Sequence, residues 1–339
     1  MATYVGHTAR QRELEKLYNK LCGRYSRHEV WQDMVVMIAC AIANAVDKRH
    51  FDEREAMYMR IVPKYSKEEL DIFPEFFTHI VLGMEESPDC DFLGELYMNL
   101  DLGNKHAGQF FTPYSVCQFM AECSIQDDLL EEQIKKHGWI SINDCACGAG
   151  ATLVAAANYL RSRKINYQQQ ALFVAQDVDM TVGLMCYIQL SLLGCAGYVV
   201  IGNTITEPQV GPVLFGEDSS RCWFTPMYFH AIWETRRAIA MARMMFQRVA
   251  TALPDEATDQ PKANMHDKAA APVGPAGPAR GRTADGKIED FDTAPPESAG
   301  MAPEEPTSAP ASDPEPERTP TLTISTGKKN AGQIMFDFG

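Results

Sequence analysis

The stretch that decides the fold runs from Trp139 to Ala151, WISINDCACGAGA, and consists of a short apolar run followed by a glycine-containing turn. Apolar side chains at helical spacing continue it over 151–163. Glycines at a strand-to-helix turn let the backbone approach a ligand closely, and the first helical turn offers unpaired N–H groups. The stretch therefore predicts a small-molecule site at the end of a strand. A tight turn whose glycines serve only the backbone is the alternative.

Strand and helix patterns alternate on both sides of this stretch. Apolar patterns predict strands over 171–175 and 198–201, and helices over 112–124, 180–193 and 227–251. Strands and helices that alternate at this spacing are typical of a parallel sheet with right-handed crossovers. The sequence therefore predicts an α/β fold that contains half of a doubly wound sheet.

The first hundred residues have a different pattern. Apolar residues recur at helical spacing over 28–46 and 68–83, and Ser66 followed by Glu69 is the pattern of a capping box. We therefore expect an α-helical N-terminal domain over 1–100, followed by the α/β domain over 101–251.

The C-terminal part changes composition abruptly. Thirteen of the twenty prolines lie in 252–320, among Ala, Gly, Glu and Asp, which leaves too few apolar residues to offset the cost of ordering the chain. We expect a disordered linker over 252–326. Residues 327–339 end in the apolar string GQIMFDFG, which suggests a docking peptide on a tether; packing against its own domain is the alternative.

Charge and cysteine usage limit the possible functions. The net charge is −14, of which residues 252–326 contribute −8, and no Lys/Arg cluster is longer than a pair. This argues against strong independent DNA binding, since a protein that grips phosphates normally has a basic face. Ten scattered cysteines without a C-x-x-C pair favour buried thiols in a reducing cytosol over disulfides or a metal site. With no export signal or apolar stretch long enough to span a bilayer, we expect a cytoplasmic protein that uses no metal and no membrane.

Polar residues follow the second and third predicted strands. Asp177, in the string QDVD, is placed to accept hydrogen bonds from ribose hydroxyls, while Asp179 precedes an apolar helix and suits an N-cap. Helix capping is also the alternative for Asp177. Asn203 follows the third strand, where its amide can bond an adenine edge, although an ordinary turn explains it equally well.

Four segments in this order resemble the N6-adenine DNA methylase family, which includes the modification subunits of type I restriction systems. The segments are GQFFTP at 108–113, DCACGAGA at 144–151, AQDVD at 175–179 and GNTITEP at 202–208. The resemblance implies a Rossmann-like, S-adenosylmethionine-dependent methyltransferase core with a truncated parallel sheet.

The resemblance also implies roles for single residues. Thr112 would hold the methionine carboxylate, residues 144–150 would cradle the amino-acid moiety, Asp177 would bind the ribose and Asn203 would face the adenine. Asn203 departs from the family's usual Asp, and Cys145 from its usual Pro. The cofactor-binding residues expected on this basis are Gln109, Phe111, Thr112, Pro113, Asp144, Ala146, Gly148, Gly150, Asp177 and Asn203.

The family's catalytic Asn/Asp-Pro-Pro-Tyr/Phe motif, which holds the flipped adenine, does not occur in this sequence. The nearest string is Thr225-Pro226-Met227-Tyr228, so Thr225, Pro226 and Tyr228 become the candidate catalytic residues. A turn that enters the last helix is the alternative for this string. We also expect the residues beyond 251 to supply neither the remaining strands of a complete methylase sheet nor a target-recognition domain.

These observations predict an adenine-N6 DNA methyltransferase of a restriction-modification or mobile-element context, with DNA recognition supplied by a partner specificity subunit. The alternative is a catalytically impaired relative that binds S-adenosylmethionine and acts as an interaction or regulatory module. A third hypothesis is an adaptor, because Gln333 and the following aromatic residues are loosely similar to peptides that dock on bacterial sliding clamps.

Overall fold

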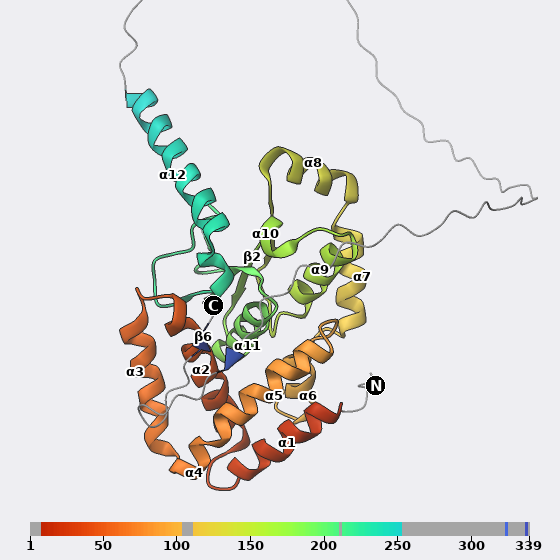
Figure 1. The fold of residues 1–339 in the computed structure, drawn as a ribbon, viewed down its shortest axis with the longest axis vertical. Helices are drawn as coiled ribbons and strands as arrows, with labels where there is room; N and C mark the ends of the chain where they lie inside the picture. Colours follow the sequence, from red (N-terminus) through yellow and green to blue (C-terminus); the bar gives the residue numbers. More distant parts are fainter. Residues whose placement is uncertain (1–7, 104–110, 210–211, 253–322, 325–335, 338–339) are drawn as a thin grey trace, which may run out of the picture. The chain divides into compact units, whose positions relative to one another are not determined.

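The fold was analysed in a computed structural model of the chain (Figure 1). The residues that it describes are 8–103, 111–209, 212–252, 323–324 and 336–337. Most of the predicted linker and of the C-terminal peptide therefore lies outside the described residues.

The N-terminal region is helical, as the apolar spacing predicts. Its elements are α1 (Ala9–Leu21), α2 (Arg27–Val46), α3 (Phe51–Ile61), the 3₁₀ turn η1 (Val62–Lys64), α4 (Lys67–Leu70), α5 (Ile72–Glu86) and α6 (Phe92–Asn99). The predicted capping box is present: Ser66 accepts from the backbone N–H of Glu69, whose side chain accepts from the N–H of Ser66. It starts the short α4 rather than the longer α5.

The second region contains a four-stranded sheet with the order β1-β2-β3-β4. Its strands are β1 (Ile140–Asp144), β2 (Ala171–Asp177), β3 (Ala196–Ile201) and β4 (Cys222–Phe224). The first three are parallel, with Ile142 opposite Phe173 and Val174 opposite Tyr198. They agree with the predicted strands. The three-residue β4 was not predicted, and it pairs antiparallel with β3.

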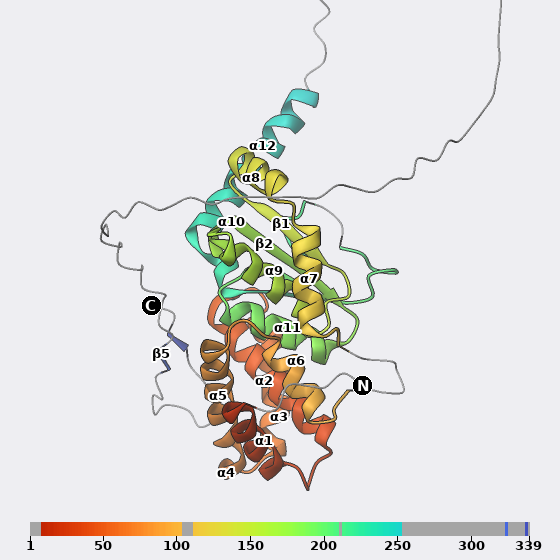
Figure 2. The same ribbon diagram turned by 90° about the vertical axis from the view of Figure 1, so that its right-hand side faces the viewer.

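Helices connect and cover these strands. They are α7 (Tyr114–Ser124), α8 (Asp127–His137), α9 (Ala151–Ser162), α10 (Tyr167–Gln170), α11 (Met180–Leu192), the 3₁₀ turn η3 (Pro226–Phe229) and α12 (Ala231–Ala252). Figure 2 shows α7 beside α9, and the two helices pack together. The single helix predicted over 227–251 is divided into η3 and α12, and the later part of α12 projects from the rest (Figure 1).

One hydrophobic core joins the N-terminal helices to the sheet. The buried indole N–H of Trp31 on α2 points to the sulfur of Met185 on α11, 3.4 Å away. Arg54 on α3 is also buried and donates to Asp47 at 2.7 Å and to the carbonyl of Cys222 on β4 at 2.9 Å. The domain boundary that we expected near residue 100 is therefore not a break in the core, because residues on both sides of it are buried together.

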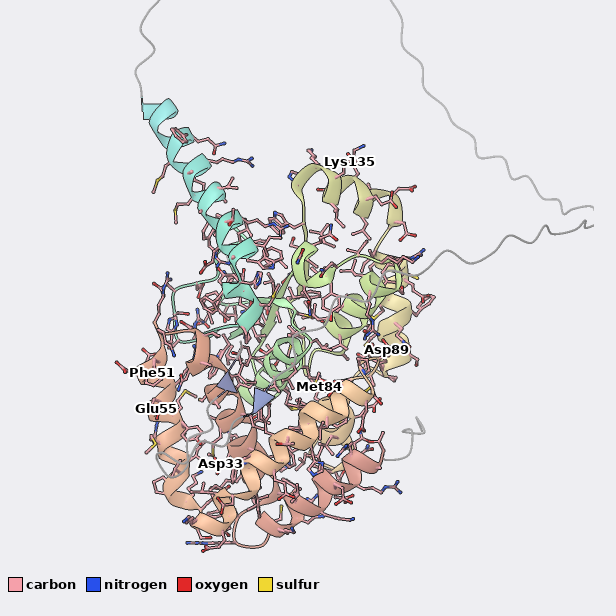
Figure 3. All side chains as sticks on the ribbon, in the orientation of Figure 1. Asp33, Phe51, Glu55, Met84, Asp89 and Lys135 are labelled. Carbon is pink, nitrogen blue, oxygen red and sulfur yellow. The ribbon has the colours of Figure 1, made fainter. Side chains whose placement is uncertain are left out.

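The helix α2 is long and apolar enough to cross a membrane by length and composition alone. Most of its residues are buried inside the protein, where it packs against α3 and α11. The helix also carries the buried Asp33, which is labelled in Figure 3. Its carboxylate accepts from Lys64 Nζ at 3.1 Å and from the Tyr65 hydroxyl at 2.9 Å. These contacts are those of a core helix.

Candidate functional site

The glycine-containing turn follows β1 directly. Asp144, the last residue of β1, accepts from the N–H of Ala146 at 3.0 Å and from the hydroxyl of Thr152 on α9. Gly150 has a φ of 97°, and a Cβ there would lie 2.8 Å from the sulfur of Cys186. Both the backbone conformation and the close packing therefore require glycine at this position.

The same turn is joined to the end of β2. Gly148, with a φ of 52°, donates its N–H to the carboxylate of Asp177 at 2.8 Å. The other carboxylate oxygen of Asp177 accepts from the N–H of Asp179 at 2.9 Å, and Asp179 itself caps α11. The structure thus separates the two acids as the sequence predicts: Asp179 is the helix cap, whereas Asp177 lies against the glycine turn.

The segment after β3 also contacts the glycine turn. The hydroxyl of Thr204 donates to the carbonyl of Cys145 at 2.5 Å, which ties this segment to the glycine turn. Asn203 is exposed, and its side-chain oxygen accepts from the N–H of Ile205 at 2.9 Å. Gln176 on β2 donates to the carbonyl of Glu207 at 2.9 Å. Three segments that are far apart in the sequence therefore meet at the carboxyl ends of β1, β2 and β3.

The segment before α7 is brought to the same place, as far as it is described. Gln109 lies outside the described residues. The ring of Phe111 is half-buried, 5.6 Å from the ring of Tyr97, and a Cβ at Gly148 would lie 3.5 Å from it. Thr112 and Pro113 are exposed, and they lead directly into α7.

Two apolar residues in this region were missed by sequence reasoning. Val178 directly follows Asp177 and is 70 % exposed. Ile205 lies two residues after Asn203 and is 91 % exposed. Exposed aliphatic side chains beside a carboxylate and an amide are suited to flank a flat heterocyclic ring. The available signal was the valine between two acids in QDVD, which cannot serve as a core residue if the strand ends at Asp177.

The candidate catalytic residues are not brought to this site. Thr225 is fully buried; its hydroxyl donates to the carbonyl of Cys195 at 2.7 Å and accepts from the N–H of Gly197 at 3.0 Å. Because β4 runs antiparallel, its end lies beside the beginning of β3, whereas Asn203 follows the end of β3. Thr225 therefore lies at the opposite end of the sheet from Gly148 and Asp177.

Tyr228 and Pro226 belong to the same buried structure. The hydroxyl of Tyr228 donates to the carbonyl of Leu214 at 2.9 Å, and its ring lies 4.7 Å from that of Phe224. Burial raises the pKa of Tyr228. Pro226 begins η3. The geometry corrects the catalytic prediction: the string 225–228 forms the turn that enters the last helix, which was the alternative.

The comparison with protein families identifies a region that contains the glycine turn and Asp177. Residues 91–254 match the sequence model of the family described as N-6 DNA Methylase. This region belongs to the N-6 DNA methylase family. The match of the N-6 DNA methylase region begins at Asp91, so most of the N-terminal helices lie outside it.

Other comparisons add less. The chain is similar to a solved structure described as a putative class I S-adenosylmethionine-dependent methyltransferase from Listeria monocytogenes, with 17 % identity and a TM-score of 0.31. The match covers 60 % of this chain and 57 % of that one. No curated protein matches the sequence.

The cofactor implied for the N-6 DNA methylase region is S-adenosylmethionine. The residues at the strand ends fit such a molecule. A glycine turn with positive φ values offers a close backbone approach, Asp177 offers a carboxylate at the end of β2, and Val178 and Ile205 offer apolar surface.

Proposed function

We propose that this chain binds S-adenosylmethionine at the carboxyl ends of β1, β2 and β3 and takes part in methylation of adenine N6 in DNA. The observation that supports the proposal most strongly is the 2.8 Å hydrogen bond from Gly148 to Asp177. This bond holds the loop expected to bind the amino-acid moiety next to the carboxylate expected to bind the ribose. Bound there, S-adenosylmethionine supplies an activated methyl group.

Each part of the site has a proposed task. Residues 144–150 bind the amino-acid moiety, and Thr112 binds its carboxylate. Asp177 accepts from the ribose hydroxyls, and Asn203 bonds the adenine edge. Val178 and Ile205 cover the faces of the adenine and exclude water from them. Together these contacts fix the direction of the methyl group, and positioning of this kind supplies much of the rate of a group transfer.

The residues that receive the target base are proposed to come from a partner chain. Within the described residues β1 pairs only with β2, and Ser141 and Asn143 on β1 are exposed. In doubly wound sheets the ligand lies in the crevice where the strand order reverses. The described strands follow one another in sequence order from β1 to β4, so a partner strand beside β1 would create such a crevice. A partner that packs there completes the crevice and brings DNA recognition, which suits a chain that has no basic cluster longer than a pair.

Calorimetry with S-adenosylmethionine tests cofactor binding directly. We expect saturable binding by the full chain and no detectable binding by Gly148→Val, since a β-branched side chain is strained at the positive φ of Gly148 and would change the shape of the turn. Gly138→Val is the matched control: Gly138 also has a positive φ, of 78°, but it ends α8 away from the turn. Failure of the wild-type chain to bind would end the proposal.

Transfer of a labelled methyl group to adenine-containing DNA tests the activity, with the chain alone and together with candidate specificity subunits. A second candidate function is a cofactor-binding module without catalysis of its own. The burial of Thr225 and Tyr228 favours it, because neither side chain is free to hold a base. Methyl transfer by the chain alone would exclude this second candidate. Transfer only with a partner would support an active site whose base-binding residues come from that partner.

A further inference from the structure

A buried hydrogen-bond network joins the N-terminal helices to the glycine turn. Its centre is the side-chain amide of Gln189, which is fully buried on α11 among apolar residues. The amide nitrogen donates to the carbonyl of Ala149 at 2.8 Å and to the carboxylate of Asp91 at 2.7 Å. Ala149 lies between Gly148 and Gly150, so this amide binds the middle of the glycine turn.

The hydrogen-bond network allows the side-chain amide of Gln189 only one orientation. Its oxygen accepts from the N–H of Leu93 at 3.2 Å, and its two N–H groups are both used by Ala149 and Asp91. A reversed amide would place an oxygen against the carbonyl of Ala149 and the carboxylate of Asp91, and an N–H group against the N–H of Leu93. Asp91 and Leu93 therefore determine which atom of Gln189 faces the turn.

Asp91 is itself held in place. Its carboxylate accepts from the N–H of Gly94 at 3.1 Å, as the N-cap of α6, and a Cβ at Gly94 would lie 1.9 Å from it. The preceding residues are fixed to α9: Asp89 pairs with Arg161 at 2.7 Å (Asp89 is labelled in Figure 3), and the carbonyl of Pro88 accepts from Asn158 at 2.9 Å. The start of α6 is therefore a rigid support.

We infer that Gln189, oriented by Asp91, is a positioning residue that sets the glycine turn for the amino-acid part of S-adenosylmethionine. This inference rests on the proposed function. The carbonyl of Ala149 belongs to the peptide unit before Gly150, whose φ of 97° sets the direction of the chain into α9. The N–H of Gly150 in the same peptide unit donates to the carbonyl of Cys147 at 2.8 Å, so turning the Ala149 carbonyl would break the hydrogen bond that closes the turn and would change the shape that a ligand meets.

The test compares two ligands and matched variants. Gln189→Leu removes the amide at similar size, and Gln168→Leu is the control because Gln168 also donates to a backbone carbonyl, that of Leu193 at 3.3 Å, away from the turn. S-adenosylmethionine and 5′-methylthioadenosine are titrated into each folded protein; the second ligand lacks the amino-acid moiety. Thermal unfolding of each variant gives its stability separately.

We expect Gln189→Leu to weaken S-adenosylmethionine binding about tenfold or more, the effect of one misplaced buried hydrogen-bonding group, and 5′-methylthioadenosine binding by less than about threefold. Gln168→Leu should bind both ligands as the wild type does. Asp91→Asn, which keeps an acceptor oxygen for Gln189, should retain binding, whereas Asp91→Leu should lose it. A merely structural role would not separate the two ligands, and equal losses for both would overturn the inference.

Hydrogen exchange of the unliganded proteins provides a second measurement. We expect the amides of 147–151 to exchange faster in Gln189→Leu than in the wild type or in Gln168→Leu. Unchanged exchange in Gln189→Leu would overturn the inference, even if wild-type binding is intact. Absence of S-adenosylmethionine binding by the wild type would instead contradict the proposed function, and faster exchange would still establish that Gln189 orders the turn.

Discussion

The backbone N–H of Gly148 and the carboxylate of Asp177 are joined by a hydrogen bond of 2.8 Å across a sequence separation of 29 residues. The bond links the turn after β1 to the end of β2, at the edge of the sheet where the three parallel strands end. Asp177 can serve this bond and still face a ligand, because a carboxylate has several acceptor positions. The acid therefore shapes the turn as well as the proposed ribose site.

Replacement of Asp177 separates its role from that of its neighbour. We expect Asp177→Ala to weaken S-adenosylmethionine binding at least about tenfold, since it removes the ribose acceptor and the partner of Gly148. Asp179→Ala should cost about 1 kcal/mol of stability through the lost helix cap, with little change in affinity. Calorimetry and urea unfolding of the two variants measure these effects. The reverse pattern would assign the ribose to Asp179.

Thr225 should affect stability and not cofactor binding. Thr225→Val leaves the carbonyl of Cys195 and the N–H of Gly197 without their buried partner, which costs about 1–3 kcal/mol. Urea unfolding measures the loss, and S-adenosylmethionine affinity should remain that of the wild type. Thr225→Ser, which keeps the hydroxyl, is the control. A variant of normal stability that has lost methyl transfer would restore the catalytic assignment.

The buried pair of Asp47 and Arg54 should make stability fall at low pH. Burial alone would raise the pKa of Asp47, but hydrogen bonds from His50 and Arg54 lower it overall. A carboxyl with a lowered pKa in the folded state stabilises above its ordinary pKa, and that stability is lost as the pH falls through the folded value. Asp47→Asn should lose about 3 kcal/mol at neutral pH, because Arg54 then stays buried without a countercharge. Unfolding curves from pH 7 to pH 3 should show the difference from the wild type shrinking.

Asp91 should behave in the opposite way. Burial raises the pKa of its carboxyl, although Gln189 and Gly94 donate hydrogen bonds to it. A raised pKa means that the folded state favours the neutral acid, so the contribution to stability is present at low pH and is lost as the pH rises through the folded value. Asp91→Asn should therefore be more stable than the wild type at pH 7, with the difference falling toward pH 4. A constant difference across this range would contradict the prediction.

The proposed clamp-binding peptide is tested separately from the methylase site. Of its residues only Phe336 and Asp337 are described, in a short antiparallel pairing with Thr323 and Ile324. A labelled 327–339 peptide should increase in fluorescence anisotropy with a bacterial sliding clamp, and the same peptide with Gln333→Ala and Phe338→Ala should not. No binding at high micromolar concentrations would end the adaptor hypothesis.

The parallel strands and the glycine turn could be predicted because each has a strong local signal. The runs at 171–175 and 198–201 are apolar on both faces, and glycines follow β1. The location of Thr225 could not be predicted in this way, because apolar residues do not show which direction a strand runs. Because β4 is short and antiparallel, Thr225 is a buried structural residue that lies away from the candidate site.

Gln189 gave no recognisable sequence signal. A single glutamine in the apolar helix Met180–Leu192 is easily interpreted as a residue at the helix surface. Its role depends on Asp91 and Ala149, which lie 98 and 40 residues earlier in the chain. Contacts over such separations follow from the packing of α6 against α11, and packing of this kind is not encoded in any local pattern.

The outer edge of β1 is not paired with another strand within the described residues. An unpaired strand edge is a template for another strand, and Ser141 and Asn143 on β1 are exposed. Molecules made in excess over the proposed partner would be exposed to aggregation and proteolysis. Balanced synthesis of the two chains, at the level of gene dosage and translation, would then determine how much chain survives.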